Sequence, residues 1–290
     1  MRLAGAAVVL VLLALVAAAP ATAREERIAR GRIDGLQAGG GWVSWFRGGK
    51  QFVWRKGEVT KLDRPFLGPF GTDGAGRGVG LSADCSAASS GDVGTCTVRN
   101  RVLPDGPTSR ALVTESNFSS VDEHRGSFIV GFRGRGHPRG IYLSAGGENA
   151  ALERLSKMRP GELSVSSRAM TSFVPTDGRL YAASRNHPHR WRLLARSNHR
   201  IVGSPQAEGR FAYWLEGTFE PDGSVSATRI MRVDPEPSDR HLEEFTPPRY
   251  ISAVVVTRAR LYYVDRETGD LYEFIHPPFH RGGEPIPLGR

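Results

Sequence analysis

Six short runs of β-branched and aromatic residues recur along the chain, and Gly, Pro, Asp or Asn residues separate them. Such runs between turn residues predict β-strands, because these side chains fit the pleated surface of a sheet. The runs are Trp42 to Phe46, Val79 to Ser82, Phe128 to Phe132, Leu180 to Ala183, Phe211 to Leu215 and Leu261 to Val264. The nearest approach to helical spacing, Ala150 to Met158, is a short helical candidate that ends before Pro160. We therefore predict an all-β chain.

The runs repeat at a measurable interval. The anchors Val43, Val79, Ile129, Tyr181, Ala212 and Tyr262 have a mean spacing of about 44 residues. In the first unit, Trp42 to Leu62, glycine turns at Gly49 and Gly57 separate three predicted strands. A period of about 40 to 50 residues with this content is typical of a β-propeller. A pair of β-sandwiches would show shorter and more even spacing.

We predict a single β-propeller domain over residues 24–290, with six blades of four antiparallel strands. In such a ring, neighbouring blades cover each other's apolar faces and closure protects the strand edges. We expect the segment Glu284 to Leu288 to add a strand to the first unit and so to close the ring.

This pattern resembles that of the TolB-like six-bladed propellers found among exported bacterial proteins. The matching segments are Leu261 to Phe274, Gly140 to Ser144 and Gly71 to Gly74. No blade carries the Trp-Ser-Pro-Asp-Gly box of that family, and the fourth unit is short. The resemblance implies a scaffold for binding in which catalysis is uncommon, and it carries no functional residues over to this chain.

The first 23 residues have the features of a secretory signal peptide. Arg2 precedes an uninterrupted apolar run from Ala6 to Ala19, and a small-x-small end follows at Ala21-Thr22-Ala23. The run is too short to span a bilayer comfortably, and Pro20 interrupts it. We expect cleavage after Ala23, with a secreted or extracytoplasmic mature protein that has no transmembrane anchor; the alternative is an uncleaved anchor.

Cys85 and Cys96 are the two cysteines of the chain. The segment between them is small and polar, which predicts a loop. An even number of cysteines in an exported protein favours a disulfide. In the chain-entropy model a ring of this size contributes about 3 kcal/mol to stability. We predict a structural Cys85–Cys96 bond.

The signatures of several enzyme classes are missing from the sequence. The glycine-rich stretch from Gly74 to Gly80 has neither the spacing of a dinucleotide-binding loop nor the Lys-Ser/Thr pair of a phosphate-binding loop. No Gly-x-Ser-x-Gly nucleophile motif is present. We therefore predict no catalytic residues and no cofactor, although carboxylates brought together at a propeller axis would leave a hydrolase or a lyase open.

Three histidines are weak candidates for metal ligands. His187 and His189 lie on the same side of an extended segment, and His199 follows them. The neighbouring Asn, Pro and Arg residues are typical of a loop, and no His-Glu-x-x-His motif accompanies them. We predict polar turn residues and no metal site.

The chain is basic, with 39 Lys+Arg against 30 Asp+Glu and a net charge of +9. Two loops concentrate this charge: the first contains Arg133, Arg135, His137 and Arg139, and the second contains Arg190 and Arg192. On one rim these loops would form a positive patch, and guanidinium groups suit phosphate and carboxylate ligands. The alternative is that arginine serves only as solubilising surface charge.

The sequence thus predicts an exported, monomeric, non-enzymatic propeller. Its partner would be a protein or an anionic polymer of the cell envelope, and the export signal argues against nucleic acid. The alternative prediction is an extracytoplasmic polysaccharide hydrolase or lyase with carboxylates at the propeller axis.

Overall fold

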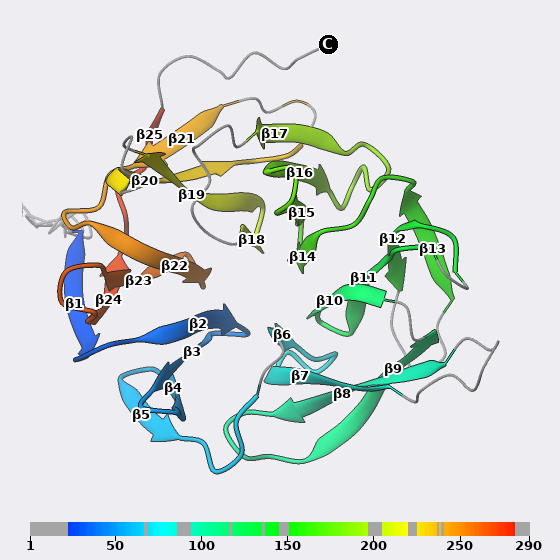
Figure 1. Cartoon of the computed structure of the whole chain (residues 1–290), viewed down its shortest axis with the longest axis horizontal. Coiled ribbons are helices and arrows are strands. Elements are labelled where there is room, and N and C mark those ends of the chain that lie inside the picture. The colour runs from blue at the N-terminus through cyan, green and yellow to red at the C-terminus, as the bar shows by residue number, and fades with distance from the viewer. Residues whose placement is uncertain are drawn as a thin grey trace, which may run out of the picture.

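The computed structural model of this protein describes residues 23–66, 69–85, 94–115, 118–134, 137–144, 151–196, 205–219, 225–236, 238 and 241–281. These residues form 25 β-strands, arranged as a ring of sheets around a central axis (Figure 1). Among them there is no helix long and apolar enough to cross a membrane. The predicted all-β propeller is confirmed at this level.

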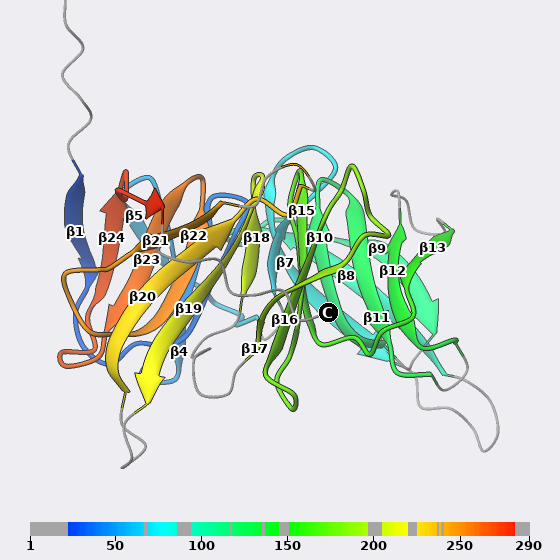
Figure 2. The same ribbon diagram turned by 90° about the horizontal axis from the view of Figure 1, so that it is seen from above.

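The sheets are built from antiparallel meanders that begin at the axis and proceed outward (Figures 1 and 2). One contains β2 (Asp34–Gly39), β3 (Trp42–Arg47), β4 (Lys50–Arg55) and β5 (Glu58–Lys61). Another contains β14 (Glu162–Val165), β15 (Ala169–Val174), β16 (Arg179–Ser184) and β17 (Arg192–Arg196). A third contains β18 (Gln206–Glu208), β19 (Phe211–Phe219), β20 (Val225–Val233) and β21 (Leu242–Phe245), with β25 (His280–Arg281) beside β21.

Between the first two of these sheets lies a sheet of eight strands. It consists of two meanders: β6 (Phe70–Thr72), β7 (Gly78–Cys85), β8 (Thr95–Val102) and β9 (Thr108–Glu115), followed by β10 (Phe118–His124), β11 (Ser127–Phe132), β12 (Gly140–Ser144) and β13 (Leu152–Ser156). A single parallel pair, Thr72 with His124, joins them through β6 and β10. Because of this pair, the strand pairing does not by itself confirm six separate blades.

A glycine permits the close approach of β6 and β10. A Cβ atom on Gly71 would lie 2.5 Å from the carbonyl oxygen of Glu123, closer than such atoms can pack. Any larger residue at this position would push the two strands apart.

The N-terminal segment closes the ring. The last sheet contains β22 (Ile251–Thr257), β23 (Arg260–Asp265) and β24 (Leu271–Ile275), and its outer strand is β1 (Arg24–Ala29), which pairs with β24. Closure thus joins the first described strand to β24, which lies near the C-terminal end of the described chain. The segment expected to provide a closing strand, Glu284 to Leu288, lies outside the described residues.

The apolar core lies between neighbouring sheets. Trp45 on β3 belongs to one buried cluster with Tyr262 on β23, and Leu180 on β16 belongs to another with Trp214 on β19. Both tryptophan side chains are buried, with 1% of each residue exposed. The alternation of inward and outward residues in each strand therefore stabilises the ring through packing between the sheets.

Two expectations about individual elements are wrong. The helical candidate Ala150 to Met158 contains the strand β13. The anchor Tyr181 lies on β16, the third strand of its meander, whereas the other five anchors lie on second strands. The true second strand, β15, carries the fully buried polar residues Thr171 and Ser172, so its sequence does not show an apolar run.

Candidate functional site

Six strands, the first of each meander, surround the axis of the ring: β2, β6, β10, β14, β18 and β22 (Figure 1). Two cavities lie along this axis. The wider one, of about 1140 Å³, is lined by the beginnings of these strands, and the narrower one, of about 200 Å³, by their ends. Five residues line both cavities and so form the neck between them: Ala38, Phe70, Asp122, Ser164 and Gln206.

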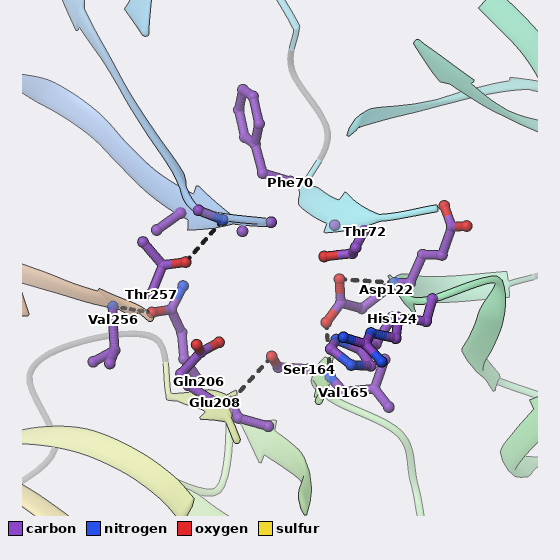
Figure 3. A pocket seen from close by; sticks show the side chains of 18 of the residues that line it. Phe70, Thr72, Asp122, His124, Ser164, Val165, Gln206, Glu208, Val256 and Thr257 are labelled. Atoms are coloured by element: carbon purple, nitrogen blue, oxygen red, sulfur yellow. Dashed lines mark hydrogen bonds between the residues drawn. The ribbon is translucent and has the colours of Figure 1, made fainter. Parts of the chain in front are cut away.

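The polar side chains at the neck connect one inner strand to the next (Figure 3). Asp122 on β10 accepts a hydrogen bond from the Val165 amide of β14, with 2.7 Å between Oδ2 and N. Ser164 on β14 accepts one from the Ala207 amide of β18 at 3.1 Å. Three inner strands therefore carry an acceptor at the equivalent position, because Gln206 on β18 likewise accepts from the Val256 amide of β22 at 2.7 Å.

These contacts satisfy backbone N–H groups that have no hydrogen-bond partner within a β-sheet. β14 and β18 pair only with the second strands of their own meanders, so their N–H groups toward the preceding meander need acceptors. A serine hydroxyl and a glutamine carbonyl are sufficient acceptors at two of the three positions. The fold therefore does not require a charge at Asp122.

The Asp122 carboxylate is nevertheless buried, with only 6% of the residue exposed. Its Oδ1 accepts from its neighbour's amide, that of Glu123, at 2.9 Å, and the Ser164 side chain is a further hydrogen-bond partner. Burial raises the pKa of Asp122 to about 7, and these hydrogen bonds offset only part of that effect. A carboxylate with a pKa near neutral can both accept and donate a proton under ordinary conditions.

The Gln206 side chain provides a fixed hydrogen-bond donor at the same neck. Its Oε1 is engaged by the Val256 amide (Figure 3), and the residue lines both cavities, so that Nε2 is the donor group of this side chain at the neck. The neck thus presents a proton acceptor from β10, a hydroxyl from β14 and an amide donor from β18.

The residues next to Asp122 extend this polar region. Burial raises the pKa of Glu123 to about 8, with smaller contributions from the nearby carboxylates Asp73 and Asp122. Burial and the neighbouring Arg185 and Arg125 lower the pKa of the His124 imidazole to about 4, so this ring is neutral at neutral pH. A proton at neutral pH therefore resides on the carboxyl groups rather than on the imidazole.

The narrow cavity carries a further acid, Glu208 at the end of β18. Its Oε1 accepts from the Arg258 amide at 2.6 Å, and burial raises its pKa. Within the described part of the chain, no group of three or more His, Cys, Asp or Glu residues is arranged to hold a metal ion.

The two predicted basic loops lie at opposite ends of the strands. The first joins β11 to β12, where the wide cavity opens, and the second joins β16 to β17, where the narrow cavity opens. Arg133 and Arg139 are exposed in the first loop, whose Arg135 lies outside the described residues. In the second loop Arg190 is exposed and Arg192 is half-buried. The loops therefore do not form one positive rim.

The histidines of these loops have local partners. The His137 ring lies between Phe132 and Tyr142, at 4.2 and 4.7 Å from their ring centres. His187 lies 3.0 Å from a carboxylate oxygen of Glu236, and His189 lies 3.1 Å from one of Glu153. The structure does not bring His187 and His189 together on one ligand, and His199 is outside the described residues.

Cys85 and Cys96 are directly opposite each other in the antiparallel pair of β7 and β8. Opposite residues in such a pair have Cα atoms about 4.5 to 5.5 Å apart, within the range that a disulfide requires. The register is therefore compatible with the predicted bond.

A scan against models of protein families finds no match, and neither does a search of curated proteins. Among solved structures, the chain is similar to a gluconolactonase from Xanthomonas campestris, with 16% identity, a TM-score of 0.53 and coverage of 89% of this chain and 90% of that one. It is also similar to an acylaminoacyl peptidase from Pyrococcus horikoshii (12% identity, TM-score 0.48, 86% of this chain and 45% of that one). A third is the β-propeller domain of the Trilobed protease from Pyrococcus furiosus (11% identity, TM-score 0.44, 90% and 99%).

The chain has the β-propeller fold. At these identities the similarity concerns the fold alone. None of these structures shows that the chain is a TolB-like propeller. The prediction of a non-enzymatic scaffold is corrected to this extent: a gluconolactonase is similar over 89% of this chain, so the fold does not by itself indicate a scaffold. The alternative prediction, a hydrolase or lyase with carboxylates at the axis, agrees better with this finding and with the buried Asp122.

The sequence analysis named no residue of the neck. A local signal exists in Val121-Asp122-Glu123-His124, where two adjacent carboxylates precede an Arg-Gly turn and an apolar strand. The role of Asp122 in this segment becomes visible only together with Ser164 and Gln206, which lie 42 and 84 residues further along the chain.

Proposed function

We propose that this protein is a hydrolase whose substrate enters the wide axial cavity and whose general base is Asp122. The observation that carries the proposal is the buried ionisable carboxyl group of Asp122 at the neck. Serine and glutamine make the same strand-to-strand contact without a charge, and burial raises the pKa of the carboxyl to about 7. A buried, uncompensated ionisable group at a cavity is typical of catalytic sites.

The reaction that fits one such carboxylate is the hydrolysis of a carboxylic ester, including a cyclic ester. Ionised Asp122 takes a proton from water as the water oxygen forms a bond to the carbonyl carbon. Gln206 donates a hydrogen bond from Nε2 to the carbonyl oxygen, where negative charge develops. When the carbon–oxygen bond to the leaving alcohol breaks, protonated Asp122 returns the proton to that oxygen, and the products are an acid and an alcohol.

A small polyhydroxylated lactone is the substrate class that we favour. The cavity of about 1140 Å³ is large enough for such a ligand, and hydroxyl-bearing residues such as Ser82, Thr108 and Ser252 line it. The gluconolactonase from Xanthomonas campestris supports this class, since its name denotes the opening of a sugar lactone.

The experiment is a turnover assay of the purified mature protein on sugar lactones, linear esters and neutral polysaccharides. We expect proton release with lactones, and a loss of about 10²- to 10⁴-fold in kcat/KM for Asp122→Asn. Asp84→Asn is the matched control, because Asp84 is an exposed carboxylate that pairs with Arg99 and lines neither cavity. Turnover that survives Asp122→Asn would refute Asp122 as the base.

Cleavage of a glycosidic bond is the second candidate function. It needs two carboxyl groups on either side of the bond, and the wide cavity is lined by Glu162 of β14 as well as by Asp122. Release of reducing ends from a polysaccharide, lost in both Glu162→Gln and Asp122→Asn, would favour this candidate over ester hydrolysis.

Several further assignments belong to this proposal. We count the two meanders of the eight-stranded sheet as two blades, which gives six blades in all and agrees with the TolB-like resemblance. We retain cleavage of the leader after Ala23, an extracytoplasmic location, a monomeric state and the Cys85–Cys96 disulfide. The exposed arginines of the two loops are proposed only as a surface for anionic polymers of the envelope.

A further inference from the structure

An arginine forms part of the wall of the wide cavity at some distance from the neck. Arg101 lies near the end of β8, and its guanidinium stacks on the Phe66 ring, with Cζ 3.8 Å from the ring centre. Its Nη2 donates to the carbonyl oxygen of Arg64 at 2.6 Å. These two contacts fix the plane of the guanidinium, so that its position relative to the cavity is set in advance of binding.

This guanidinium is largely removed from water, and its ion-pair partner is a partly exposed carboxylate. Only 14% of its side chain is exposed, and it forms a long ion pair with Asp105, whose Oδ1 lies 3.9 Å from Nη2 and whose side chain is 42% exposed. Its Nε has no hydrogen-bond partner among the described residues. Burial lowers the pKa of Arg101, and Asp105 offsets this only in part. One long ion pair with a partly exposed carboxylate compensates the buried charge only in part, so a further anion at this wall would be favourable.

A second positive charge lies beside it. Arg64 is exposed, lines the same cavity, and is close enough to lower the pKa of Arg101 further by repulsion. Two like charges at one wall favour an anion between them. The carboxylates that line this cavity, Asp122 and Glu162, belong to β10 and β14.

We propose that Arg101, Arg64 and the Phe66 ring form a subsite for the carboxylate of the substrate, so that the natural substrate is an anionic lactone derived from a dicarboxylic sugar acid. The inference rests on the proposed function for its reaction, since the carboxylate bound here is distinct from the ester opened at Asp122. A bidentate guanidinium–carboxylate pair supplies both affinity and orientation.

The test compares two lactones, D-glucaro-1,4-lactone, which carries a free carboxylate, and the neutral D-glucono-1,5-lactone. We expect the wild-type protein to prefer the charged lactone in kcat/KM. Arg101→Gln should reduce kcat/KM for the charged lactone at least tenfold, mainly through KM, and leave the neutral one within twofold. Arg101→Lys, which keeps the charge but loses the planar fork, should recover only part of the loss.

The matched control is Arg99→Gln, two residues earlier on β8, where the side chain pairs with Asp84 and does not line the cavity. Equal rates for the two lactones, or equal losses for both in Arg101→Gln, would overturn the subsite. Melting temperatures of all variants distinguish a folding defect from a binding defect.

A binding measurement separates this inference from the proposed function. Calorimetry with D-gluconate and with its uncharged counterpart D-glucitol needs no turnover. Binding of gluconate alone, weakened at high salt and lost in Arg101→Gln, would support the subsite even if no lactone were hydrolysed. Hydrolysis that depends on Asp122 but shows no preference for a carboxylate would overturn the subsite and leave the proposed function standing.

Discussion

The carboxylate of Asp122 accepts a hydrogen bond from the amide of Val165 at 2.7 Å, across the space between two inner strands that share no ladder. This contact has a structural purpose, because it satisfies a backbone donor of β14. The same purpose is fulfilled by the neutral Ser164 one strand further around the axis. The buried charge at Asp122 therefore needs an explanation other than stability, and general-base catalysis supplies one.

The pH dependence of the rate follows from the pKa of Asp122. The base must be ionised, and burial raises its pKa to about 7. We expect kcat/KM to increase as the pH rises from 5 to 8, with a midpoint near pH 7. Initial rates in a series of buffers, corrected for spontaneous opening of the lactone, measure this profile. A rate that is already at its plateau at pH 5 would contradict the assignment.

The free energy of unfolding should change with pH in the direction opposite to that of kcat/KM. Asp122 has a higher pKa in the folded protein than in the unfolded chain, 7 against 3.8, so the folded state binds the extra proton between these values. Its contribution to the free energy of unfolding is complete below pH 3.8 and is lost as the pH rises through about 7.

Urea unfolding of wild type and Asp122→Ser from pH 4 to pH 7 tests this linkage. The wild-type free energy of unfolding should decrease more steeply, by an extra 1.4 kcal/mol or so per pH unit, which is about one proton. Parallel pH dependences in the two proteins would show that Asp122 titrates normally.

Gln206 is expected to act in the transition state. The variant Gln206→Glu keeps the acceptor for the Val256 amide but removes the Nε2 donor. We predict a fall in kcat of about 10²- to 10³-fold with a smaller change in KM. The added carboxylate should also move the midpoint of the pH–rate profile upward, because a like charge raises the pKa of Asp122. An unchanged kcat would exclude the amide as a donor to the reacting oxygen.

The junction of β6 and β10 should tolerate no side chain at Gly71. In Gly71→Ala the new Cβ meets the carbonyl oxygen of Glu123, and neither backbone can yield easily. We expect a loss of about 1 to 3 kcal/mol in unfolding free energy. Gly74→Ala is the control, since nothing lies within 4 Å of its Cβ position. Equal stability of the two variants would show that the strands can separate without loss.

The fold could be predicted from the sequence because its strands are short, apolar and separated by turn residues. Five of the six anchors lie on second strands, where both faces are packed between sheets. The second strand of the remaining meander, β15, could not be recognised, because the fully buried Thr171 and Ser172 interrupt its apolar residues. The role of β1 in closure was missed because pairing with β24 joins residues about 245 positions apart, for which no local pattern exists.

The candidate site could not be predicted in the same way. Asp122, Ser164 and Gln206 meet only when three meanders are placed around one axis, and each is a common residue in an unremarkable local sequence. The basic loops, by contrast, are visible as charge runs, but successive turns of a meander lie at opposite ends of the strands. This is why the two loops do not share a rim.

The most direct test of the account is Asp122→Ser, which places at this position the residue that serves the same contact on β14. Its kcat/KM on the best lactone and its unfolding free energy at pH 8 would be measured on one preparation. We predict that activity falls by at least about 10²-fold while stability is unchanged or higher, because a buried charge is removed. Retained activity together with lost stability would show that Asp122 is a structural residue and would contradict the proposed function.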